Sequence, residues 1–277
     1  MNSMQLPERI CSARQKPLEL YVFIDPLCSE CWALDPLIRK LQIEYGHYFK
    51  LKQVLTGKLT ALNTSKPLLA VERGGSGLAC EESIWMEETV ESPFLASIAI
   101  KAAELQGKRA GSKFLRKIQE QLFLDKENIA DLAVLTRCAE EAGLDKKEFL
   151  NDIYSAGATK AFQCDLAITC EMDVDEAPTI VFFNERIEDE GIKISGLYSY
   201  DIYVQILQEI LEEIPEPLAP PSLEEFMQYF RIAATSEIRG VYDWTDTQTE
   251  CEMKKLLLQR KVRKINTKCG AFWEYTQ

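Results

Sequence analysis

The stretch Leu18-Glu-Leu-Tyr-Val-Phe-Ile-Asp-Pro-Leu-Cys-Ser-Glu-Cys31 decides how the rest of this chain is interpreted. Its apolar first half predicts a strand over residues 18–24, which Asp25 and Pro26 end. Two cysteines in C-x-x-C spacing follow at once. Beside them begins an apolar pattern of helical period, which predicts a helix over residues 29–45. A strand, a cysteine pair and a helix start therefore fall within one short segment.

Cys28 and Cys31 in this setting favour a thioredoxin-type redox arrangement. Unpaired backbone N–H groups and the helix dipole can stabilise a thiolate on Cys28, and Cys31 is close enough to close a disulfide. The alternative is half of a zinc knuckle, which needs two further Cys or His ligands. The sequence holds no second C-x-x-C. We expect Cys28 to be the more exposed cysteine, with Cys31 buried behind it.

Composition excludes several classes of function. The chain has 277 residues, 46% of them hydrophobic, and a net charge of −12. This charge disfavours nucleic acid and anionic membrane as partners. The N-terminus shows no apolar signal-peptide core, and no apolar run is long enough to span a bilayer. The nine cysteines are irregularly spaced, which is typical of free thiols in a reducing cytoplasm.

The remaining pattern predicts an α/β domain followed by a small module. Residues 1–17 are expected to be a flexible tail, and residues 18–214 a domain with a helical insert at about 93–172. Further strands are predicted at 49–55, 178–184 and 192–195, and a closing helix at 199–213. The Pro-rich stretch 215–221 is predicted to be a linker, and residues 222–277 a separate module.

The module shows three helical segments and then a hairpin, which is the winged-helix pattern. Ser222 and Glu225 have the spacing of a capping box for its first helix. A winged helix commonly binds DNA, but the third helix opens with Asp246, Glu250 and Glu252. Carboxylates at that position repel phosphates, so we expect no sequence-specific DNA binding.

The cysteine motif, the helical insert and Ala177-Pro178-Thr-Ile-Val-Phe-Phe together resemble the DsbA-like branch of the thioredoxin superfamily. This resemblance covers roughly residues 17–214. It implies a thioredoxin-like, DsbA-type fold in which Pro178 is a cis-proline beside the Cys28/Cys31 pair.

The full chain resembles the YjbH/SpxH family more closely. The signature lies in the segment around Cys28, in Leu59-Thr-Ala-Leu-Asn63 and in Asp243-Trp-Thr-Asp-Thr-Gln-Thr-Glu250. The resemblance implies a cytoplasmic adaptor that binds the transcription regulator Spx and promotes its degradation by the ClpXP protease. Family members often carry a His/Cys-rich N-terminal segment, proposed to bind zinc. Here that segment has only Cys11 and no histidine, so zinc is poorly supported and we expect no cofactor.

Three functions stay open on the sequence: an adaptor, a cytosolic thiol–disulfide oxidoreductase that uses Cys28 and Cys31, and a DNA-binding regulator. Glu30 lies between the cysteines, where its negative charge disfavours a thiolate on Cys28. The helix dipole opposes this effect. A strongly oxidising enzyme depends on a strongly stabilised thiolate. The sequence therefore favours an adaptor built on a redox fold, with residual thiol chemistry at most.

Overall fold

The computed structural model describes residues 16–58, 94–184, 191–267 and 270–276. One signature segment, residues 59–63, lies outside these ranges, as do Cys11 and nearly all of the predicted tail. None of the helices in the described ranges is long and apolar enough to cross a membrane.

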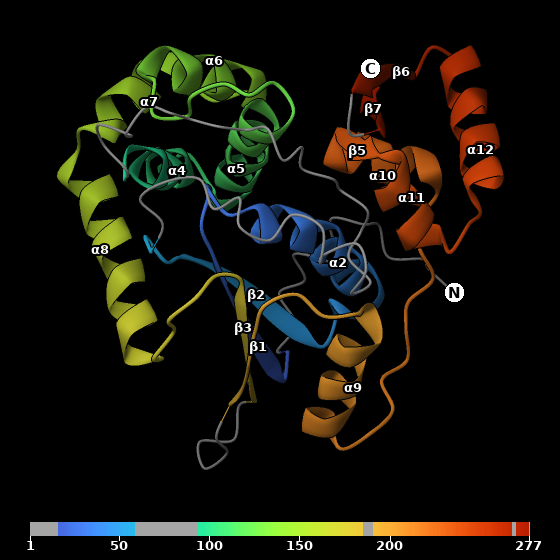
Figure 1. The fold of residues 1–277 in the computed structure, drawn as a ribbon, viewed down its shortest axis with the longest axis horizontal. Coiled ribbons are helices and arrows are strands. Elements are labelled where there is room, and N and C mark those ends of the chain that lie inside the picture. Colours follow the sequence, from blue (N-terminus) through green and yellow to red (C-terminus); the bar gives the residue numbers. More distant parts are fainter. Residues whose placement is uncertain (1–15, 59–93, 185–190, 268–269, 277) are drawn as a thin grey trace.

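The first domain is built on a mixed sheet with the strand order β2-β1-β3-β4. β1 pairs in parallel with β2 and antiparallel with β3, and β3 pairs antiparallel with β4 (Figure 1). The strands span β1 Leu18–Ile24, β2 Phe49–Leu55, β3 Thr179–Asn184 and β4 Ile192–Ser195. All four predicted strands are confirmed within a residue.

One face of β1 is buried along its whole length, and Phe23 is buried on the opposite face, which explains the nearly continuous apolar sequence of this strand. Leu20 and Val22 belong to the main hydrophobic core. Phe23, on the opposite face, packs in a smaller cluster that includes Ile168 and Met172. The helix α2, Ser29–Tyr45, connects β1 to the parallel strand β2, and α9, Tyr200–Leu211, packs against α2. This places the start of α2 at the end of a central strand.

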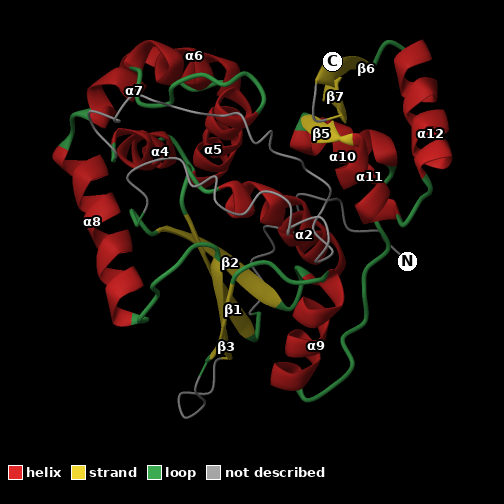
Figure 2. Cartoon of the chain, in the orientation of Figure 1, coloured by secondary structure: helices red, strands yellow, loops and turns green. Residues whose placement is uncertain are grey.

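The helical insert consists of five helices, as the amphipathic pattern between 93 and 172 predicts (Figure 2). Their bounds are α4 Leu95–Leu105, α5 Lys108–Phe123, α6 Leu132–Ala142, α7 Lys146–Ile153 and α8 Ala156–Glu171. Asp131, Asp145 and Ser155 cap the last three helices through side-chain oxygens. Gly143 ends α6 at a φ of 80°, a conformation that favours glycine.

The C-terminal module contains three helices and a three-stranded sheet of order β5-β7-β6. Its elements are α10 Leu223–Phe230, β5 Ile232–Ala234, α11 Thr235–Tyr242, α12 Asp246–Leu258, β6 Val262–Thr267 and β7 Gly270–Tyr275. The capping box of Ser222 and Glu225 is confirmed. Strand β5 is an addition to the predicted elements. The assignment of the module as a winged helix stays a prediction.

The module packs directly against α2, so its core and the main core meet. Ile43 of α2 is fully buried in the module's own cluster. Conversely, Ile232 and Phe272 of the module belong to the main core. The linker is also held, because the Leu218 N–H donates to the Glu44 carbonyl at 2.8 Å. Contacts therefore connect the two sides of the predicted boundary at 215–221. The division of the chain into domains stays a prediction.

Candidate site at the cysteine pair

Cys28 occupies the N-cap position of α2, directly after the turn that ends β1. The Cys28 N–H donates to the Asp25 carbonyl at 3.1 Å, and the Leu27 N–H donates to Asp25 Oδ1 at 3.0 Å. The Cys31 N–H then donates to Cys28 Sγ at 3.2 Å. The sulfur thus replaces the oxygen that usually caps a helix, and it accepts from an N–H of the first turn that has no partner within the helix.

The third predicted site residue, Pro178, lies beside the cysteines. The Ala177–Pro178 peptide bond is cis, which is the geometry that the resemblance implies. The Cys28 thiol donates to the Ala177 carbonyl at 3.4 Å. Segments 149 residues apart in the sequence therefore meet at one sulfur atom. The structure brings Cys28, Cys31 and Pro178 together, and their catalytic roles stay predictions.

The prediction that Cys28 is the more exposed of the two cysteines is wrong, whereas Cys31 is buried as predicted. Its relative exposure is 1%, and that of Cys31 is 3%. Both side chains belong to the main hydrophobic core, where Leu27 is also buried. Burial raises the pKa of the Cys31 thiol well above its usual value, and the hydrogen bond with Cys28 and the charge of Asp25 raise it further. Cys31 is therefore a neutral thiol at physiological pH and a poor nucleophile.

This burial predicts the order in which the folded, reduced protein reacts with an alkylating reagent. Cys164, Cys170 and Cys251 are exposed and should be modified first, whereas Cys28 and Cys31 should react only after the fold opens. Pulsed alkylation followed by peptide mapping measures the rates, and the same protein in denaturant supplies the unprotected reference. Modification of Cys28 in the first pulse would show that the site is accessible in solution.

Trp32, the residue after the cysteine pair, connects the site to a buried network of charges. Its side chain has 0% exposure, and the guanidinium carbon of Arg116 lies 4.0 Å from the ring centroid. Arg116 comes from α5 of the insert. Arg116 and Trp32 therefore form a buried cation–π contact, and such contacts are strongest when they are shielded from water.

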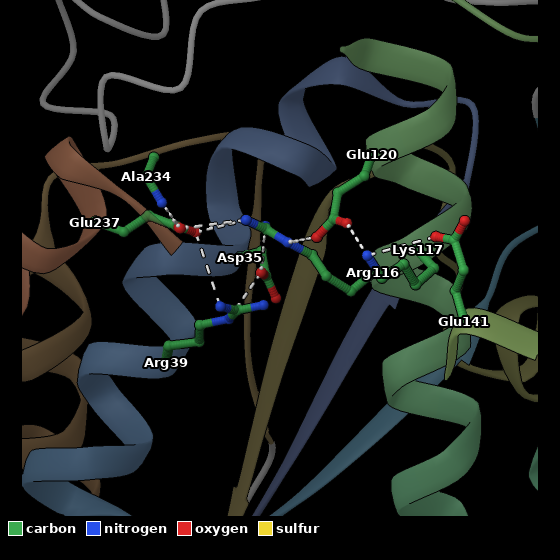
Figure 3. A network of polar contacts seen from close by, with 8 residues as sticks. All are labelled: Asp35, Arg39, Arg116, Lys117, Glu120, Glu141, Ala234 and Glu237. Atoms are coloured by element: carbon green, nitrogen blue, oxygen red, sulfur yellow. Dashed lines mark hydrogen bonds and ion pairs between the residues drawn. The ribbon is translucent and has the colours of Figure 1, made fainter. Parts of the chain in front are cut away.

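Arg116 is the centre of this network, which we call the buried ion network (Figure 3). It donates to Asp35 of α2 at 2.9 Å, to Glu120 of its own helix at 3.2 Å, and to both oxygens of Glu237 of α11 at 3.1 and 3.2 Å. Burial alone lowers the pKa of Arg116, but Glu237, Asp35 and Glu120 outweigh it, so the net pKa is raised. The guanidinium stays charged and joins three parts of the fold.

Other groups complete the network on each side. The Ala234 N–H donates to Glu237 at 2.6 Å, and Arg39 pairs with Asp35 at 2.9 Å. Lys117 pairs with Glu120 at 3.0 Å and reaches Glu141 at 3.7 Å. Sequence reasoning missed this network, because the i,i+4 spacing of Asp35 with Arg39 and of Arg116 with Glu120 is also typical of solvated helix faces.

No group of three or more His, Cys, Asp or Glu side chains within the described ranges could hold a metal ion. The Cys11 region lies outside them. The expectation that the protein uses no cofactor stays a prediction.

The sheet order, the helical insert and the cysteine pair at the start of α2 define a protein of the thioredoxin-like class, of DsbA type. A family model described as Thioredoxin matches residues 21–205. A putative protein disulfide isomerase from Nitrosomonas europaea has a similar structure, with a TM-score of 0.55 and 18% identity over 72% of this chain and 98% of that one. The cytosolic disulfide reductase DsbM from Pseudomonas aeruginosa also has a TM-score of 0.55, with 19% identity over 70% of this chain and 98% of that one. These likenesses confirm the predicted fold.

Relatives of higher identity cover the module as well. The ClpXP adapter protein SpxH of Bacillus subtilis (strain 168) is 48% identical over 94% of this chain and 90% of its own length. The protein of the same name from Halalkalibacterium halodurans is 45% identical over 95% of this chain and 90% of its own length. The chain belongs to the SpxH family.

Proposed function

We propose that this chain is a cytoplasmic adaptor that binds the transcription regulator Spx and delivers it to the ClpXP protease. The observation that carries the proposal is that relatives named ClpXP adapter protein SpxH align with nearly the whole chain, module included. An adaptor needs a rigid surface rather than an open reaction centre. The packing of the module against α2 and the burial of both cysteines agree with that requirement.

Addition of the purified chain should accelerate the degradation of purified Spx by ClpXP several-fold, because an adaptor raises the local concentration of its client at the protease. The assay follows the loss of Spx on gels with ATP and excess reductant. A ClpXP substrate unrelated to Spx is the control, and its degradation rate should not change. An unchanged rate for Spx would contradict the proposal.

One observation favours a second function, a thiol–disulfide oxidoreductase. Cys28 lies at the N-cap of α2, where its Sγ accepts a hydrogen bond from the N–H of Cys31, the second cysteine of the C-x-x-C pair. Turnover requires Sγ to reach a substrate disulfide, and at 1% exposure Cys28 reaches one only if the site opens. The adaptor is therefore the better supported function.

A further inference from the structure

Three cations meet where the helical insert faces the module, and we call them the cationic cluster: Arg109 and Lys113 of α5, and Arg231 at the end of α10. All three are exposed. The guanidinium carbon of Arg109 lies 4.6 Å from the ring centroid of Tyr229, so a residue of the insert is seated on a residue of the module. Figure 1 shows α5 beside α10 and β5. The cluster therefore spans two parts of the fold and exists only when the module is docked.

The charges of Arg109 and Lys113 are not compensated within the described part of the chain, where neither side chain makes an ion pair. The first turn of α5 contains no acidic residue, and Gly107 before it offers no capping side chain. Cations near a helix N-terminus are unfavourable, because the dipole is positive there. Arg116 and Lys117, two turns further along the same helix, are fully paired with carboxylates. The lack of partners is thus confined to the outer end of α5.

The cations also repel one another. Burial lowers the pKa of Lys113, and the charges of Arg109 and Arg231 lower it further. The contacts nevertheless fix the positions of these groups. Arg231 holds a left-handed φ of 67°, and the Tyr275 N–H donates to its carbonyl at 2.7 Å. Its guanidinium carbon lies 5.1 Å from the ring centroid of Tyr275. Aromatic rings therefore orient both guanidinium groups.

We propose that the cationic cluster docks a short acidic segment of a protein partner. Oriented guanidinium groups match carboxylates in a planar, bidentate way, and a bound carboxylate would relieve both the mutual repulsion and the unfavourable helix end. The net charge of −12 repels a long polyanion such as nucleic acid more strongly than a segment with a few carboxylates, which favours a short acidic segment. The proposal rests on the proposed function only for the role of the partner, as a client or a component of the protease.

The probe is a fluorescein-labelled peptide of eight glutamates, and its binding to the full-length chain is followed by fluorescence anisotropy. The variant Arg109→Gln/Lys113→Gln should bind about tenfold more weakly, because two charge-assisted contacts are lost. The matched control is Lys147→Gln/Lys160→Gln, two exposed lysines on α7 and α8 that change the net charge equally. The control should bind like the unmodified chain, and added salt should weaken all binding.

Equal affinities of the two variants would overturn the proposal, and so would equally tight binding of a single-stranded DNA of the same charge. The Spx degradation assay with the same variants separates this proposal from the adaptor role. If Spx is delivered but the two variants bind the peptide equally, the proposed role of the cationic cluster is wrong and the proposed adaptor function is supported. If the two variants differ in their affinity for the peptide but Spx is not delivered, the proposed adaptor function is wrong and the proposed role of the cationic cluster is supported.

Discussion

Replacement of Arg116 by methionine should lower the free energy of unfolding by about 3–5 kcal/mol, the usual loss when one partner of a buried ion pair is removed. Methionine keeps most of the side-chain volume that packs on Trp32. The loss of stability therefore measures the removal of the charge rather than the creation of a cavity. Without the guanidinium, Asp35, Glu120 and Glu237 face one another with too few cations, and the Glu237 side chain is only 1% exposed. Because Glu237 belongs to α11, the module should detach more easily.

Urea unfolding followed by tryptophan fluorescence measures this loss. The control is Lys146→Met, which removes an exposed ion pair with Glu140 and should change stability by no more than about 0.5–1 kcal/mol. The double variant Arg116→Met/Glu237→Gln should recover part of the loss, because the most buried carboxylate is then neutral. A loss of the same size in Lys146→Met and Arg116→Met would contradict the structural role of the buried ion network.

The sequence predicts the β1-α2-β2 unit well, because local signals agree with the tertiary structure there. The strand at 18–24 is apolar except at Glu19, and the helix at 29–45 begins beside a residue that can cap it. Both bounds match the structure. The capping box of Ser222 and the acidic start of α12 at Asp246 are likewise local features, and the structure contains both.

Features that depend on distant contacts could not be predicted in this way. Strand β5 has three residues, too few for an alternating pattern, and it exists because it pairs with β7. Arg116 pairs with Glu237 across 121 residues, and no local spacing indicates such a partner. The burial of Cys28 depends in part on the carbonyl of Ala177, which only the folded chain brings to the sulfur.

Replacement of Cys28 and Cys31 together by alanine should abolish any thiol–disulfide turnover and leave the delivery of Spx largely intact. Turnover requires a thiolate that forms a mixed disulfide, and no such intermediate can form without Cys28. Delivery depends on a surface of many side chains, to which two buried thiols contribute little. A second variant, Cys28→Ser/Cys31→Ala, keeps an oxygen at the N-cap of α2 and controls for the loss of helix capping.

The most direct test of the adaptor account is the degradation rate of purified Spx by ClpXP in excess reductant, compared between the unmodified chain and these two cysteine variants. Circular dichroism and urea unfolding first establish that each variant is folded. The account predicts that both variants stimulate degradation nearly as well as the unmodified chain. Loss of stimulation in both folded variants would contradict a thiol-independent adaptor and favour the oxidoreductase.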